Sequence, residues 1–148
     1  MMPTHRLAMP ADAVRLFELR RRSILTLAPR EMSRPDAETW AATLNVAGME
    51  QKIRELEIWV AEVDRVIAGW GAIHGNRLEG LYTDPEFVCQ GIATGLLELL
   101  EALMRQRGIA AVSSQASANA ERFYFRRGYE PIADRTLKQG QPMRKRLR

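Results

Sequence analysis

Apolar residues recur at helical spacing in the first third of the chain. A short strand is predicted at 6–9, and a helix is predicted from Pro10 to about Leu27. Pro29 ends this helix, and Pro35 stands where a first helical turn tolerates proline. A second helix from there carries Trp40, and a third is predicted at 49–56. The apolar positions of the first helix are Val14, Leu16, Phe17, Leu19, Ile24 and Leu27.

The spacing changes to that of strands in the middle third. Runs rich in β-branched and aromatic residues occupy 57–63, 66–73 and 77–83. Asp64-Arg65 separates the first two runs, and Gly75-Asn76 separates the second two, as expected for tight hairpin turns. These runs therefore predict three sequential antiparallel strands.

The last third alternates between the two patterns. A helix is predicted at 91–107, with Gly108 as its terminator, and a shorter helix at 119–127. Strands are predicted at 109–116, 129–133 and 143–147. The helix at 91–107 is a crossover, so the strands on either side of it should be parallel. The fold class is α/β (mixed α+β), with a mixed, mostly antiparallel sheet of about six to seven strands and helices on both faces. One domain is expected over residues 1–148.

Composition excludes several classes of protein. The chain has 148 residues with one cysteine, Cys89, and two histidines, so neither a disulfide framework nor a Cys/His zinc site is expected. No stretch approaches the roughly 20 apolar residues of a membrane span, and the N-terminus lacks a signal-peptide core. We therefore expect a cytoplasmic protein with no membrane partner.

The net charge of +4 lies at the C-terminus. Arg144, Lys145, Arg146 and Arg148 carry four positive charges, and the remaining 18 basic residues balance 18 acidic ones. Because the rest of the chain is neutral, no nucleic-acid partner is expected. The alternation of Met143, Lys145 and Leu147 also fits an edge strand.

Small residues gather where the strand at 77–83 leads into the helix at 91–107. Gly91, Ala93 and Gly95 begin this helix, and the free N–H groups of a helix N-terminus bind phosphates. The segment lacks both the Lys-Ser/Thr of a Walker loop and the three glycines of a Rossmann fingerprint. The same small residues also fit simple close packing of the helix on the sheet.

Two separated segments together resemble the GNAT superfamily of acetyl-CoA-dependent N-acetyltransferases. The first is Leu81-Tyr82-Thr83-Asp84-Pro85 followed by Gly-x-Ala-x-Gly-Leu-Leu from Gly91, and the second is 120–129, which contains Phe-Tyr-x-x-x-Gly-Tyr. The predicted element order is also similar across nearly the whole chain. Val88 and Cys89 depart from the family's phosphate loop, which has Gln or Arg and then Gly there. The resemblance therefore leaves the affinity for acetyl-CoA open.

The resemblance implies a cofactor site on this loop and the preceding strand. The strand at 77–83 should splay from the strand at 109–116, so that the pantetheine arm pairs with the main chain of Leu81, Tyr82 and Thr83. The family often has an Asn against the pantetheine seven residues before the tyrosine, and this position is Ser117 here. Asn119 is only five residues before the tyrosine, and a helix cap fits it equally well. The pyrophosphate would bind the backbone N–H groups of Cys89, Gln90, Gly91, Ile92, Ala93 and Thr94.

The resemblance also implies a catalytic acid, Tyr124, which would protonate the CoA thiolate. Glu79 is the candidate general base, with Glu62, His74 or an ordered water as alternatives. Glu79 also fits a purely structural interpretation, in which its carboxylate is simply solvated on the strand. Asp84 and Glu86 are expected to form a turn or face outward, since their charge would repel phosphates. Cys89 as a nucleophile ranks below its role as a loop residue.

The predicted function is transfer of the acetyl group of acetyl-CoA to a primary amine by direct attack in a ternary complex. The alternative is an acyl-CoA-binding or sensor protein without efficient turnover. The acceptor is a small-molecule or peptide amine, no metal is expected, and a homodimer stays open. Tryptophans fit either the acceptor pocket or the core, namely Trp40, Trp59 and Trp70.

Overall fold

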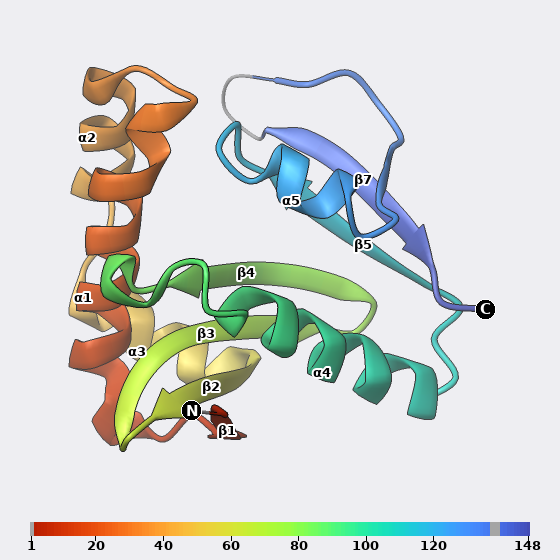
Figure 1. Ribbon diagram of the computed structural model, residues 1–148, viewed down its shortest axis with the longest axis horizontal. Helices are drawn as coiled ribbons and strands as arrows, with labels where there is room; N and C mark the ends of the chain where they lie inside the picture. The colour runs from red at the N-terminus through yellow and green to blue at the C-terminus, as the bar shows by residue number, and fades with distance from the viewer. Residues whose placement is uncertain (1, 137–139) are drawn as a thin grey trace.

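The computed structural model describes residues 2–136 and 140–148, and within them seven strands form one mixed sheet in the order β1-β2-β3-β4-β5-β7-β6. The fold class predicted from the sequence is confirmed. Figure 1 shows the sheet with helices packed along it, and none of the helices in the described part is long and apolar enough to cross a membrane. The strands are β1 (Thr4–Leu7), β2 (Glu57–Val63), β3 (Val66–His74), β4 (Arg77–Thr83), β5 (Ala111–Ala116), β6 (Glu130–Pro131) and β7 (Gln141–Arg146).

The first third forms the helical layer on one face of the sheet. A short 3-10 turn (Pro10–Asp12) leads into α1, and another (Ala28–Arg30) follows it. Ser33 caps α2 by accepting the N–H of Asp36, and Pro35 lies in its first turn as predicted. Asn45 caps α3 in the same way by accepting the N–H of Gly48. The helices are α1 (Ala13–Leu27), α2 (Arg34–Ala42) and α3 (Val46–Glu55).

The middle third is the predicted antiparallel meander of β2, β3 and β4. Asp64 and Arg65 both adopt positive φ values of 51° and 67°, which a two-residue hairpin turn of this hand requires. Trp70 projects from β3 toward α1, where its Nε1–H donates to the carbonyl of Leu16 over 3.2 Å. Trp70 is therefore a core residue, which confirms the core interpretation and not the acceptor-pocket one for this tryptophan.

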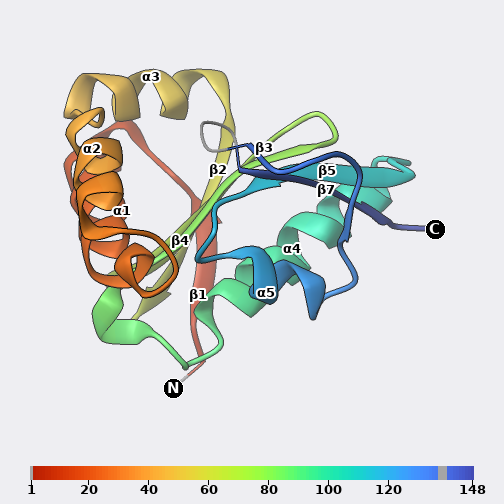
Figure 2. The same ribbon diagram turned by 90° about the horizontal axis from the view of Figure 1, so that it is seen from above.

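Helix α4 (Ile92–Gln106) packs on the opposite face of the meander, beyond two glycines of β3. A Cβ atom on Gly69 would lie 2.6 Å from a methyl of Ile92, and one on Gly71 would lie 2.8 Å from a methyl of Leu100. The missing side chains therefore allow the helix to approach the sheet closely. Figure 2 shows α1 and α2 on one side of the meander and α4 on the other.

Strands β4 and β5 are parallel, as the crossover predicted, but only their first parts pair. Arg77 lies opposite Ser113 and Leu78 opposite Ser114, and no further pair follows. The two strands then diverge toward the helical layer (Figure 1). From Glu79 onward, the side of β4 that faces β5 has no strand partner among the described residues.

The C-terminal residues correct one sequence prediction. β7 pairs with β5 along its whole length and with β6 on its other side, so it is an interior strand and not an edge strand. Met143 and Leu147 are buried, while the Nζ of Lys145 donates to the carboxylate of Glu101 in α4 over 2.9 Å. The predicted strand at 129–133 is shorter, since β6 holds only Glu130–Pro131.

Candidate active site

Two cavities meet where β4 separates from β5. The larger, of about 460 Å³, lies between β4, the loop before α4, and α5 (Glu121–Phe125). The smaller, of about 80 Å³, opens toward α2 and is lined by Trp40, Glu79 and Tyr82 among others. Leu81, Ala120 and Tyr124 line both cavities. The splay therefore provides an opening on each side of Tyr124.

The loop before α4 presents free N–H groups to the larger cavity. The first hydrogen bond of the helix joins the N–H of Gly95 to the carbonyl of Gly91, which leaves the N–H groups of Ile92, Ala93 and Thr94 without helical partners. Gly91 has a φ of +79°, and a Cβ atom built on it would meet nothing within 4 Å. This open space above free donors suits a phosphate group.

Arg127 borders the same cavity and was not predicted from the sequence. Its guanidinium stacks 3.7 Å from the centre of the Phe123 ring and donates over 2.6 Å to the hydroxyl of Thr94. It also donates to the carbonyl of Phe123 over 2.9 Å, while its Nε is shielded from solvent without a partner. A fixed positive charge thus stands beside the free N–H groups of α4.

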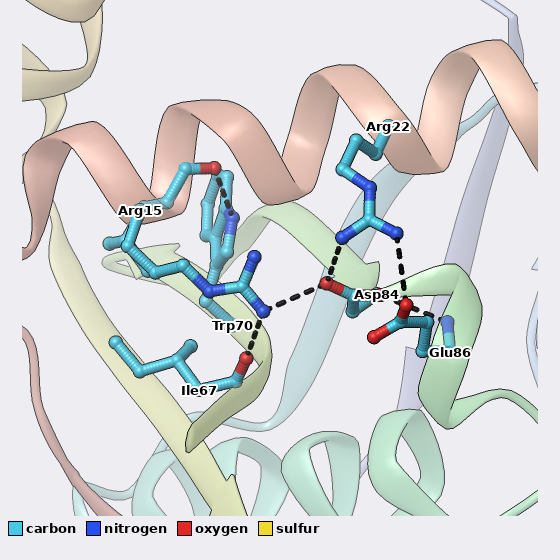
Figure 3. A network of polar contacts seen from close by, with 7 residues as sticks. Arg15, Arg22, Ile67, Trp70, Asp84 and Glu86 are labelled. Atoms are coloured by element: carbon cyan, nitrogen blue, oxygen red, sulfur yellow. Dashed lines mark hydrogen bonds and ion pairs between the residues drawn. The ribbon is translucent and has the colours of Figure 1, made fainter. Parts of the chain in front are cut away.

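Asp84 anchors the start of this loop to α1 (Figure 3). Its carboxylate has no solvent exposure and accepts from Arg15 over 2.8 Å and from Arg22 over 3.0 Å. It also accepts the N–H of Glu86, so it forms the predicted turn. The prediction that Asp84 faces outward is wrong, because the two arginines of α1 neutralise its charge inside the protein. Glu86 does face outward, with 73% of its side chain exposed.

Burial alone would raise the pKa of the Asp84 carboxyl. Three neighbours outweigh burial and hold this pKa below its ordinary value. Glu86 donates its backbone N–H to the carboxylate, Arg15 adds a hydrogen bond and a positive charge, and Arg22 adds a second positive charge. Asp84 therefore stays ionised at neutral pH, and its charge binds the loop to α1 and does not face the larger cavity.

Tyr124 is nearly buried at the junction of the two cavities, with 5% of its surface exposed. Burial raises the pKa of its hydroxyl well above the ordinary value, and the nearby Tyr82 raises it further, while a hydrogen bond with Ser114 lowers it. The hydroxyl therefore keeps its proton at neutral pH and is available as a donor.

The candidate bases lie in different surroundings. Glu79 lines the smaller cavity together with Tyr124, and its carboxylate accepts from Arg77 over 3.1 Å. Glu62 is paired with Arg6 of β1, and His74 is exposed at the end of β3. Neither Glu62 nor His74 lines either of these two cavities.

The other predicted cofactor residues divide between the cavities. The larger is lined by Leu81, Thr83, Cys89, Gly91, Ile92, Ala93, Thr94 and Asn119, and the smaller by Leu81, Tyr82 and Ser117. Gln90 is exposed and lines neither. Asn119 is not the cap of α5, because the N-cap residue is Ala120. The side-chain amide oxygen of Asn119 instead accepts from the hydroxyl of Ser117 over 2.7 Å.

Cys89 and the tryptophans are also placed by the structure. Cys89 is exposed in the loop with a positive φ of 61°, and Trp40 lines the smaller cavity. Trp59 is half-buried and donates to the carboxylate of Glu57 over 2.9 Å. Among the described residues, no cluster of three or more His, Cys, Asp or Glu side chains is arranged to hold a metal ion.

Residues 28–147 match the model of the acetyltransferase (GNAT) domain. The chain belongs to the GNAT family. The resemblance inferred from the sequence is thereby confirmed, and this GNAT protein is an acyltransferase. It is 23% identical over 123 residues to the uncharacterised N-acetyltransferase YafP of Escherichia coli K12, covering 83% of this chain and 78% of that one.

Solved structures share the GNAT fold along the whole chain. A GCN5-related N-acetyltransferase from Rhodopseudomonas palustris is 25% identical with a TM-score of 0.93, covering 99% of this chain and 96% of that one. The PaiA N-acetyltransferase of Thermoplasma acidophilum, in complex with coenzyme A, is 21% identical with a TM-score of 0.81 and covers 99% of each chain. YncA of Salmonella typhimurium, with its cofactor acetyl-CoA, has a TM-score of 0.70 at 19% identity, with coverage of 100% and 95%.

Proposed function

We propose that this enzyme transfers the acetyl group of acetyl-CoA to a primary amine by direct attack in a ternary complex. The observation that carries the proposal is the position of Tyr124, whose side chain borders both cavities where β4 leaves β5. A thioester reaching this point from the larger cavity would face an amine reaching it from the smaller one. The two substrates would then react without a covalent enzyme intermediate.

The larger cavity fits acetyl-CoA on three features of its own residues. The N–H groups of Ile92, Ala93 and Thr94 are free, the space above Gly91 is open, and the charge of Arg127 stands beside them. We assign the pyrophosphate to these groups and the pantetheine to the unpaired side of Leu81–Thr83. Val88 and Cys89, which replace the usual loop residues, line the cavity without blocking it.

Acetyl-CoA supplies an activated acetyl group and a thiol leaving group. Tyr124 donates its proton toward the sulfur of the leaving group. Burial disfavours the charged form of a thiol as it does that of a tyrosine, so the CoA thiolate must be protonated as it leaves. The attacking amine must be neutral, and Glu79 or a water held beside it accepts its proton. Arg77, which donates to Glu79, fixes the direction of that carboxylate.

The test is thiol release from acetyl-CoA with a panel of primary amines, in two variants. Tyr124→Phe removes the proton donor and should lower kcat about 10²-fold with little change in acetyl-CoA affinity. Arg127→Gln removes a phosphate-binding charge and should weaken acetyl-CoA binding about tenfold, because hydrogen bonds to charged groups are among the stronger ones. Calorimetric titration of acetyl-CoA separates the two effects.

Arg126→Gln is the matched control, since Arg126 is an exposed neighbour on the same turn. It should leave both kcat and acetyl-CoA affinity unchanged. Unchanged turnover in Tyr124→Phe would remove Tyr124 as the acid. Unchanged acetyl-CoA affinity in Arg127→Gln would remove Arg127 from the phosphate site.

A further inference from the structure

A third cavity, of about 100 Å³, lies on the acceptor side of the molecule, between α1 and the α2–α3 region. Two positive side chains line it, Arg20 from α1 and Lys52 from α3. The rest of its wall is apolar or uncharged and includes Phe17, Leu44 and Asn45. No carboxylate is among its lining residues.

Neither cation forms a direct ion pair with a described residue. Within residues 2–136 and 140–148, the side chains of Arg20 and Lys52 make no hydrogen bond and no ion pair, and the Nε of Arg20 is shielded from water without a partner. Arg15 and Arg22 of the same helix both bind Asp84. Two neighbouring half-buried cations that lack hydrogen-bond acceptors repel each other, and a bound anion would relieve that repulsion and supply acceptors to both.

The two cations line the third cavity and not the one assigned to the acceptor, but Tyr82 connects Arg20 to the latter. The guanidinium of Arg20 lies over the ring of Tyr82, 5.0 Å from its centre, and Tyr82 lines the smaller cavity together with Tyr124. Burial lowers the pKa of Lys52 and the charge of Arg20 lowers it further, while Glu79 and Glu55 act in the opposite direction. The positive charge of Arg20 and the negative charge of Glu79, the candidate base, therefore both act on the amino group of Lys52.

We propose that the acceptor amine carries an anionic oxygen group, a carboxylate or a phosphate, which Arg20 and Lys52 bind while its amino group lies near Glu79 and Tyr124. The inference rests on the proposed function and adds the substrate class. A carboxylate or phosphate would supply the acceptor atoms that both cations lack. A polyamine would place a second positive charge against them, so we expect it to be a poor acceptor.

The experiment compares amines that differ only in the anionic group. One arm pairs ω-amino acids of increasing length with the alkylamines that lack the carboxylate. A second arm pairs phosphoethanolamine with ethanolamine, and spermidine represents the polyamines. We expect kcat/KM to be at least about tenfold higher for the anionic member of the best pair, since two charge-assisted contacts are gained. The arm with the larger preference distinguishes carboxylate from phosphate.

Variants connect this preference to the two residues. Arg20→Gln and Lys52→Met should each remove most of it by raising KM for the anionic amine, with acetyl-CoA affinity unchanged. Arg20→Lys keeps the charge and should restore part of the preference. Arg21→Gln and Arg54→Gln, exposed on α1 and α3, are the matched controls and should have no effect. Thermal denaturation shows whether each variant is folded.

The outcomes separate the inference from the proposed function. Turnover with equal kcat/KM for both members of every pair, or a preference that survives Arg20→Gln and Lys52→Met, would overturn the inference alone. Release of no thiol with any amine, in a protein that binds acetyl-CoA, would contradict the proposed function and the inference with it.

Discussion

Asp84 is a carboxylate with no exposure to solvent, placed where β4 turns into the loop before α4. Its contacts reach Arg15 and Arg22, 69 and 62 residues earlier in the chain. Asp84 therefore joins the loop assigned to acetyl-CoA to the helical layer assigned to the acceptor, and an exposed ion pair of 3.7 Å between Glu86 and Arg22 adds to this link. This link predicts that a change at Asp84 affects both stability and cofactor binding.

Asp84→Asn should lower the free energy of unfolding by about 2–3 kcal/mol, because it leaves two arginines without their buried partner. The KM for acetyl-CoA should rise as the loop loses its anchor. Urea denaturation and steady-state kinetics measure the two effects. The control is Glu86→Gln, which changes an exposed carboxylate on the same turn and should change stability by less than about 0.5 kcal/mol. Equal effects of the two variants would contradict the anchoring role.

The same contacts set a pH dependence. The pKa of Asp84 is below its unfolded value, so its contribution is fully present above about pH 4 and is lost as the pH falls through the folded-state pKa. The difference in unfolding free energy between the wild type and Asp84→Asn should therefore shrink below about pH 4. A difference that stays constant into that range would show that the ion pairs are not its cause.

The sequence predicted that the loop before α4 and Tyr124 belong to one site, and both line the larger cavity, but it did not predict the charges around them. The loop and the Phe-Tyr motif are local patterns, so they can be recognised from consecutive residues. Arg127 and Asp84 act through partners distant in the sequence, Thr94 at 33 residues and Arg15 at 69. No periodicity marks such pairs. The acidic charge of Asp84 indicated an outward position, because nothing in its local sequence identifies Arg15 and Arg22 as its partners.

At the scale of elements, a glycine of β3 that packs against α4 has no room for a side chain, whereas a glycine of α4 itself has room for one. A Cβ on Gly71 of β3 would lie 2.8 Å from Leu100 and 3.2 Å from Leu81, whereas one on Gly95 of α4 would lie 3.7 Å from His5, an ordinary contact. Gly71→Ala should thus destabilise the protein by about 1–3 kcal/mol through overpacking. Gly95→Ala should stabilise it by up to about 1 kcal/mol through helix propensity. Denaturant titration of both variants checks the opposite signs.

The elements themselves were predicted with uneven success for a physical reason. The strands at 57–63 and 77–83 have the predicted bounds, since adjacent strands and tight turns leave local signals. The position of β7 depends on which strands it joins, and a sequence pattern does not specify neighbours. Lys145 illustrates this, because its polar side chain suggested an edge whereas Glu101 of α4 accepts its charge.

At the scale of the whole molecule, the basic C-terminus is part of the sheet and not a free arm. Leu147 is buried, its N–H donates to the carbonyl of Ala110 over 2.7 Å, and its own carbonyl accepts from Arg105. Deleting residues 144–148 should therefore unfold the protein or lower its melting temperature steeply. The double substitution Arg144→Gln/Arg146→Gln changes exposed side chains only and should leave the melting temperature almost unchanged. A stable truncated chain would contradict the interior position of β7.

This difference decides how a nucleic-acid partner should be tested. The truncation would remove binding by unfolding the protein, whereas the double substitution lowers only the charge. We expect no tight, salt-dependent binding of DNA or RNA by the intact chain, and a salt-dependent affinity lost in the double variant would contradict that expectation.

The most direct test of the proposed reaction follows the acetyl group itself. The protein is incubated with acetyl-CoA labelled in the acetyl group and with a primary amine, and the products are identified by mass spectrometry. We predict that the label appears in an amide of the amine, with one free CoA thiol per amide formed, and that Tyr124→Phe slows both products equally. Label recovered only as acetate, or only as unreacted acetyl-CoA across the amine panel, would contradict the account.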